Sequence, residues 1–105
     1  MMDKNILLDK FSKIFKIDKE NMSVYFSENK WDNFEEISSE FEEIRNEVYS
    51  FLWDASEKET LSQDEIEQRS KEFLMNKYTW LNEVGFDALK NYIFWISWHD
   101  GIMKN

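Results

Sequence analysis

The side chains that could support acid–base or metal chemistry are few in this 105-residue chain. His99 is the one histidine, and it stands beside Asp100. A histidine–aspartate metal phosphohydrolase needs further histidine ligands, and a di-iron helical bundle needs Glu-x-x-His pairs; the chain has neither. A single histidine near a helix end is more typical of a helix-dipole partner or a turn residue. His99 therefore predicts no catalytic centre.

Other signatures of catalysis or cofactor binding are also missing from the sequence. The chain has no cysteine, which excludes thiol catalysis, zinc–thiolate sites and a disulfide scaffold. It has two glycines and neither a glycine-rich phosphate loop nor an EF-hand pattern. The 22 acidic residues show no spacing that indicates a carboxylate metal site or a glycosidase pair. We expect a protein without enzymatic activity, metal or cofactor.

The acidic charge is concentrated in one segment. Residues 28–72 hold fifteen acidic and five basic side chains, a net charge of −10, whereas residues 1–27 carry +1 and residues 73–105 carry 0. This balance disfavours nucleic acid and anionic membranes as partners and permits a basic protein partner. The N-terminus lacks the apolar core of a signal peptide, so we expect a cytoplasmic protein.

The most hydrophobic segment is residues 86–98, in which nine of thirteen residues are apolar and five are aromatic. A helix over this segment would be apolar on nearly all sides, as buried helices are. Its length of about 20 Å is too short for a lipid bilayer. We therefore predict a central helix of a soluble core, ended by Gly101.

The clearest amphipathic helix is predicted earlier in the chain and contains residues 34–51. Asp32 or Asn33 is a plausible N-cap, and the pattern fades near residues 56–60. The apolar residues step by three and four, which is the spacing of one helix face. They are Phe34, Ile37, Phe41, Ile44, Val48 and Phe51.

Two further helices are predicted. The first begins at Asp3 and runs to about Lys16. The other begins at Ser62, where Ser62 and Glu65 match a capping box. It continues to Gly85, a residue typical of helix ends.

Residues 17–33 are predicted as an ordered connector, with at most a helical turn near residues 18–21. The strand-like residues 23–27 have no partner strand. The prediction is a mainly α, four-helix bundle-like single domain over residues 1–105, with a buried aromatic C-terminal helix.

The amphipathic helix also carries the most informative surface. At about 100° per residue, five of its carboxylates fall within an arc of about 60° beside the apolar face. Tyr49 and Trp53 are four residues apart and would touch each other outside that face. Aromatic residues bordered by carboxylates are typical of a binding site for a basic protein. The predicted partner-binding residues are Glu36, Glu40, Glu43, Glu47, Tyr49, Trp53, Asp54 and Glu57.

In its size, lack of cysteine, helical pattern and acidic surface with Tyr49 and Trp53, the chain resembles the small acidic immunity proteins of bacterial toxin systems. These include the contact-dependent growth inhibition and colicin-type pairs. The resemblance implies binding to a cognate toxin, often a basic nuclease, whose nucleic-acid-binding groove would face the acidic residues. It is a resemblance of character, and no family motif assigns individual residues.

Two other interpretations fit the same surface. A nucleic-acid mimic that inhibits a DNA- or RNA-binding protein would use these carboxylates in place of phosphates, although a mimic would be more uniformly acidic. A structural or adaptor domain would self-associate through exposed aromatic side chains.

Overall fold

Five α-helices make up the part of the chain that the structure, a computed structural model, describes, which is residues 2–103. The mainly α, bundle-like fold is confirmed, with one helix more than predicted. The helices are α1 (Lys4–Phe11), α2 (Lys19–Glu28), α3 (Phe34–Lys58), α4 (Gln63–Lys77) and α5 (Glu83–His99).

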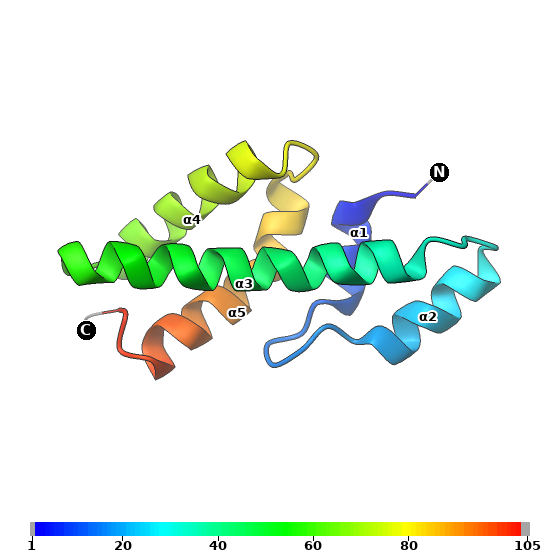
Figure 1. The fold of residues 1–105 in the computed structure, drawn as a ribbon, viewed down its shortest axis with the longest axis horizontal. Helices are drawn as coiled ribbons and strands as arrows, with labels where there is room; N and C mark the ends of the chain where they lie inside the picture. Colours follow the sequence, from blue (N-terminus) through cyan, green and yellow to red (C-terminus); the bar gives the residue numbers. More distant parts are fainter. Residues whose placement is uncertain (1, 104–105) are drawn as a thin grey trace.

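The longest helix, α3, organises the fold. In Figure 1 it lies across α1 and α5, which cross behind it, while α4 returns along one side of it and α2 along the other. The short α1 packs most extensively on α5. The loop between α1 and α2 and the C-terminal end of α5 emerge on the same side of α3.

The apolar face of α3 points into the core, as its spacing predicts. Ile37, Phe41, Ile44 and Val48 are buried, and Leu52 extends the row. The helix begins after Asn33, one of the two predicted caps, although the Asn33 side chain makes no capping hydrogen bond.

The start of α4 matches the sequence, but its end does not. Ser62 and Glu65 form the predicted capping box. The helix ends at Lys77 rather than at Gly85, and a separate cap, Asn82, begins α5. A side chain of α1 stabilises the turn between α4 and α5. The Asn5 side-chain amide donates to the Trp80 carbonyl and accepts from the backbone N–H of Asn82. Such a contact between distant residues leaves no trace in local periodicity.

Gly85 lies in the first turn of α5 and does not end a helix, so its predicted role was wrong. It is buried where α1 passes α5. A Cβ at this position would collide with the Asn5 amide and the Leu81 side chain. Gly85 is therefore required by the close approach of two helices.

The N-terminal part also differs from the prediction. The first helix ends at Phe11 instead of Lys16, and Asp18 caps a second helix over residues that were predicted as a connector. The strand-like residues 23–27 are helical because Met22 and Phe26 bury their side chains in the core. Packing here outweighs intrinsic β-propensity.

Arg45 holds the loop of residues 12–17 against α3. Only 4% of its surface is exposed, and its guanidinium donates to the Ser12 hydroxyl and to the carbonyls of Lys13, Ile14 and Lys16. Burial lowers the pKa of Arg45. Because these hydrogen bonds fix the loop, the chain leaves α1 in a defined direction and turns Phe15 outward.

The aromatic helix α5 is buried along one side only. Leu89, Ile93 and Ile96 face the core, but Trp98 is 61% exposed and Trp95 is partly exposed. The four other helices do not surround it completely, so the expectation of burial on nearly all sides was wrong for these two side chains.

Candidate partner-binding surface

The eight predicted partner-binding residues lie on the outer side of α3 and its flanks, away from the buried row. The helix places the carboxylates of Glu36, Glu40, Glu43, Glu47 and Asp54 on one flank of the buried row and Tyr49 and Trp53 on the other, so their surroundings differ. Three carboxylates have partners within the protein, two residues form an aromatic pair, and three carboxylates are unpaired among residues 2–103.

Glu40 and Glu47 are neutralised by lysines of neighbouring elements. The Lys4 amino group lies 2.7 Å from the Glu40 carboxylate, and the Lys77 amino group lies 3.3 Å from that of Glu47. The next carboxylate on the other flank, Glu42, pairs with Lys19 at 3.6 Å. The acidic field of α3 is therefore weaker than the sequence alone predicts.

Glu43 binds a tyrosine hydroxyl. The Tyr78 hydroxyl donates to the Glu43 carboxylate over 2.6 Å, and Tyr78 itself is buried. Burial, and then the hydrogen bond to Glu43, raise the pKa of Tyr78 well above its usual range. Glu43 therefore fastens the end of α4 to α3 as well as facing solvent.

The unpaired carboxylates lie near opposite ends of α3. Glu36 is in the first turn, whereas Asp54 and Glu57 are in the last two turns beside Trp53. All three are exposed, and no basic side chain within residues 2–103 forms an ion pair with them. At 1.5 Å per residue the 25-residue helix is about 37 Å long, so the two groups are separate.

Tyr49 and Trp53 touch each other as their spacing predicts. Their ring centroids lie 6.3 Å apart in an edge-to-face arrangement. Trp53 is 37% exposed, and Tyr49 is partly buried. Trp53 is thus available to a partner. We call Trp53, Asp54 and Glu57 the hairpin-end patch, because they lie near the turn that joins α3 to α4 (Figure 1).

Two exposed aromatic residues, Phe15 and Trp98, and the partly exposed Trp95 were not among the predicted site residues. Phe15 is 73% exposed, and its ring packs edge-on against Trp95 with centroids 5.0 Å apart. Trp98 lies one turn further along α5. The sequence placed Phe15 in a helix and Trp95 and Trp98 in the core, and only the lysines on either side of Ile14 and Phe15 indicated a solvent-exposed turn.

His99 lies at the end of α5, where a dipole partner is expected. Its Nδ1 atom is 2.9 Å from the Asp100 carboxylate, and its ring stacks on Trp95 with centroids 4.7 Å apart. Hydrogen bonds with His99, and after it Tyr49, lower the pKa of Asp100. No nucleophile is hydrogen-bonded to His99 in the described part of the chain. Over the same residues, no three His, Cys, Asp or Glu side chains are grouped to hold a metal.

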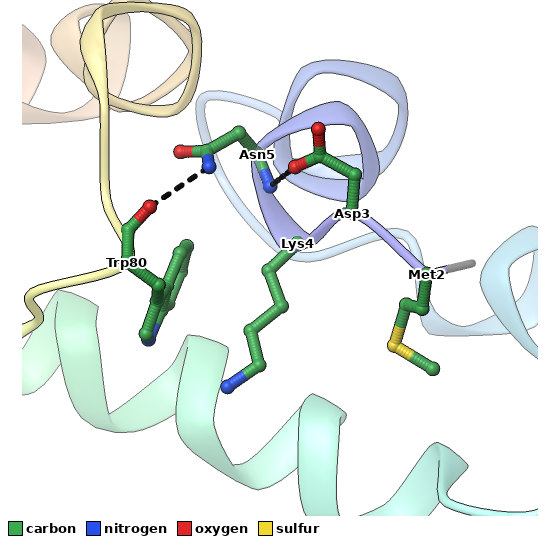
Figure 2. A pocket seen from close by; sticks show the side chains of 5 residues that line it. All are labelled: Met2, Asp3, Lys4, Asn5 and Trp80. Atoms are coloured by element: carbon green, nitrogen blue, oxygen red, sulfur yellow. Dashed lines mark hydrogen bonds between the residues drawn. The ribbon is translucent and has the colours of Figure 1, made fainter.

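An open cavity of about 510 Å³ lies beside the N-terminus of α1 (Figure 2). It is lined by Met2, Asp3, Lys4, Asn5 and Trp80. The Lys4 amino group lies 4.9 Å from the Trp80 ring centroid and forms an ion pair with Glu40. The amide of Asn5 is also occupied, by backbone groups. The Lys4 amino group and the Asn5 amide therefore serve the fold, whereas the buried indole N–H of Trp80 has no hydrogen-bond partner among the described residues.

Within residues 2–103, no helix combines the length and the hydrophobicity needed to cross a membrane. Comparisons with protein-family models, with curated proteins and with solved structures found no match to this chain.

Proposed function

We propose that this protein is a binding protein that docks a basic protein partner on the hairpin-end patch. The observation that carries the proposal is the combination of an exposed tryptophan with two exposed carboxylates that lack ion-pair partners among residues 2–103. Desolvated tryptophan side chains are among the strongest contributors to protein interfaces. Carboxylates at the rim accelerate association with a basic surface.

We further propose that the partner is a basic, nuclease-type bacterial toxin and that this chain is its immunity protein. The support is the helical fold, the net charge of −9 and the resemblance in character to acidic immunity proteins. A partner that binds nucleic acid presents a basic groove, which an acidic surface complements. In this role the protein acts in the cytoplasm of the toxin-producing cell.

The test compares protection and binding for two charge-reversed variants. Asp54→Lys/Glu57→Lys changes the patch. Glu28→Lys/Asp32→Lys is a matched control, because it reverses one Asp and one Glu, both exposed, near the other end of α3. Each protein is co-expressed with a candidate toxin domain, chosen as the C-terminal domain of any large secreted protein whose gene neighbours the gene of this chain. The wild type and the control are expected to restore growth, and the patch variant is expected to fail.

The same three proteins are used as baits to capture that domain at several salt concentrations. We expect the patch variant to associate more slowly and with less salt dependence, because steering charges have been removed. Equal protection and equal capture by all three baits would exclude the hairpin-end patch. Toxicity that the wild-type chain does not relieve would exclude the immunity role.

A further inference from the structure

Exposed and partly exposed aromatic side chains from three elements form two packed groups, which lie on either side of Asp100. Phe15, in the loop after α1, packs on Trp95 of α5, which stacks on His99. The His99 Nδ1 atom lies 2.9 Å from the Asp100 carboxylate, whose pKa is lowered by hydrogen bonds with His99 and then Tyr49, and Tyr49 packs on Trp53 of α3. We call the set formed by these aromatic residues and Trp98 the aromatic band. Its members are Phe15, Tyr49, Trp53, Trp95, Trp98 and His99.

The band is held in place before any partner binds. Arg45 fixes the loop that carries Phe15 through hydrogen bonds to the carbonyls of Lys13, Ile14 and Lys16. Trp95 is held between Phe15 and His99. A preorganised aromatic surface loses little conformational entropy when it is covered. Phe15 and Trp98 nevertheless remain 73% and 61% exposed within the single chain.

The two ends of the band carry opposite charge. At one end Lys13 and Lys16 flank Phe15, and both are exposed. At the other end Asp54 and Glu57 flank Trp53, and both are exposed. Figure 1 shows that the loop of residues 12–17 and the end of α5 emerge on one side of α3. A surface with an aromatic centre, a basic end and an acidic end is complementary to itself when it is turned by a two-fold axis.

We propose that the aromatic band is the interface of a homodimer, in which the basic end of each protomer faces the acidic end of its partner. A two-fold interface contains every contact twice, so both opposite-charge pairings form together. Aromatic residues dominate the centre of such interfaces, and charged residues form the rim. The acidic end is shared with the hairpin-end patch, so the second copy and a basic partner compete for it. The dimer does not depend on the function proposed above.

The oligomeric state of the purified chain tests the proposal by sedimentation velocity over a range of concentrations. We expect a monomer–dimer equilibrium. Phe15→Ser should weaken the dimer about tenfold or more, as loss of an interface anchor does. Val24→Ser is the matched control: Val24 is a 55% exposed apolar residue of α2 outside the band, and its replacement should leave dissociation unchanged. Circular dichroism establishes that both variants are folded.

A charge-exchange experiment tests the two-fold arrangement. Lys13→Glu/Lys16→Glu and Asp54→Lys/Glu57→Lys should each weaken the dimer, because like charges then face each other at both ends. Mixing the two variants should restore association, since opposite charges face each other at both ends of the mixed dimer. The control Glu28→Lys/Asp32→Lys should dimerise as the wild type does and should gain nothing from mixing.

Three results would overturn the proposal. The first is a wild-type chain that remains monomeric at millimolar concentration. The second is a Phe15→Ser variant that dimerises as well as the wild type. The third is a mixture of the two charge-reversed variants that shows no restored association. Vesicles of anionic phosphatidylglycerol provide the remaining probe. A monomeric chain that sediments with these vesicles through Phe15 would assign the band to a lipid surface instead. None of these outcomes depends on toxin protection, so the dimer and the immunity role can fail separately.

Discussion

The Arg45 guanidinium lies over the ring of Tyr92, with its central carbon 4.3 Å from the ring centroid. The same guanidinium donates to the loop that connects α1 to α2, so a residue of α3 joins α5 and that loop. No carboxylate forms an ion pair with it among residues 2–103. The charge is satisfied by backbone oxygens, which lose their partner if the guanidinium is removed.

Replacing Arg45 with Met should therefore destabilise the fold by about 3 kcal/mol, because the partly buried hydrogen bonds from the guanidinium to the loop are lost. Arg45→Lys is the matched variant, since it keeps the charge but loses the planar fork, and it should recover only part of the loss. Urea denaturation gives both free energies of unfolding. Hydrogen exchange of residues 12–17 should accelerate in both variants, and an unchanged rate would contradict the role of Arg45 in holding this loop.

Gly85→Ala tests the close approach of α1 and α5. The added methyl group meets the Asn5 amide and the Leu81 side chain, so we expect a destabilisation of about 1–3 kcal/mol from overpacking. In an Asn5→Ala background the same substitution should cost less, because the amide no longer occupies the space. The coupling energy comes from thermal or urea unfolding of the double-mutant cycle. Additive effects would mean that Asn5 does not restrict position 85.

Stability should fall in acid because three carboxyl groups have lowered pKa values in the folded protein. The lowering comes mainly from hydrogen bonds with Asn21 for Asp18, with Ser62 for Glu65 and with His99 for Asp100. The unfolded chain therefore binds protons at a higher pH than the folded chain does. Stability contributed by these groups is present above the usual pKa values and is lost as pH falls through about 4 and below.

The melting temperature of the wild type should decline over this range, and Asp18→Asn should show a shallower decline. Asp9→Asn is a suitable control, because Asp9 is exposed and has no hydrogen bond or ion pair from its side chain among the described residues. Identical pH profiles for all three proteins would show that Asp18 contributes nothing to the acid response.

The sequence predicts those parts of the fold that depend on local pattern. The steps of three and four from Phe34 to Phe51 specify α3, and the Ser62–Glu65 capping box specifies the start of α4. The end of α4 and the position of Gly85 depend on Asn5, some 75 to 80 residues away in sequence. The periodicity of apolar residues in the sequence contains no information about such contacts between distant residues.

The candidate surface was predictable to a similar extent. Periodicity predicts that Tyr49 touches Trp53 and that the carboxylates of α3 face outward. It does not reveal that Lys4 and Lys77 lie close enough to neutralise Glu40 and Glu47, because these lysines belong to other helices. Nor does it reveal Phe15, whose outward direction follows from the hydrogen bonds of Arg45.

Replacing a carboxylate that has an ion-pair partner within the protein should cost more stability than replacing one that has none. Glu40→Gln removes an ion pair with Lys4 that is partly shielded from solvent, whereas Glu57→Gln removes no ion pair among residues 2–103. We expect a loss of up to about 1 kcal/mol for Glu40→Gln, in the range of partly exposed ion pairs, and no measurable loss for Glu57→Gln. Urea denaturation at low and high salt checks this, since screening should reduce the difference. Equal losses in both variants would contradict the division of the surface.

Trp53 is the residue at which stability and binding should separate. Its side chain is 37% exposed and touches Tyr49, whereas the adjacent Leu52 is fully buried. Leu52→Ala should cost about 2–5 kcal/mol, as large-to-small substitutions in a core do. Trp53→Ala should cost much less, because part of its apolar surface already contacts water. Both free energies of unfolding come from urea denaturation, and dimer dissociation and toxin protection are measured on the same proteins.

If Trp53→Ala destabilises the chain as much as Leu52→Ala does, Trp53 belongs to the core. A small loss of stability together with loss of association would make Trp53 an interface anchor, and the salt dependence of the remaining binding would then report how much Asp54 and Glu57 contribute.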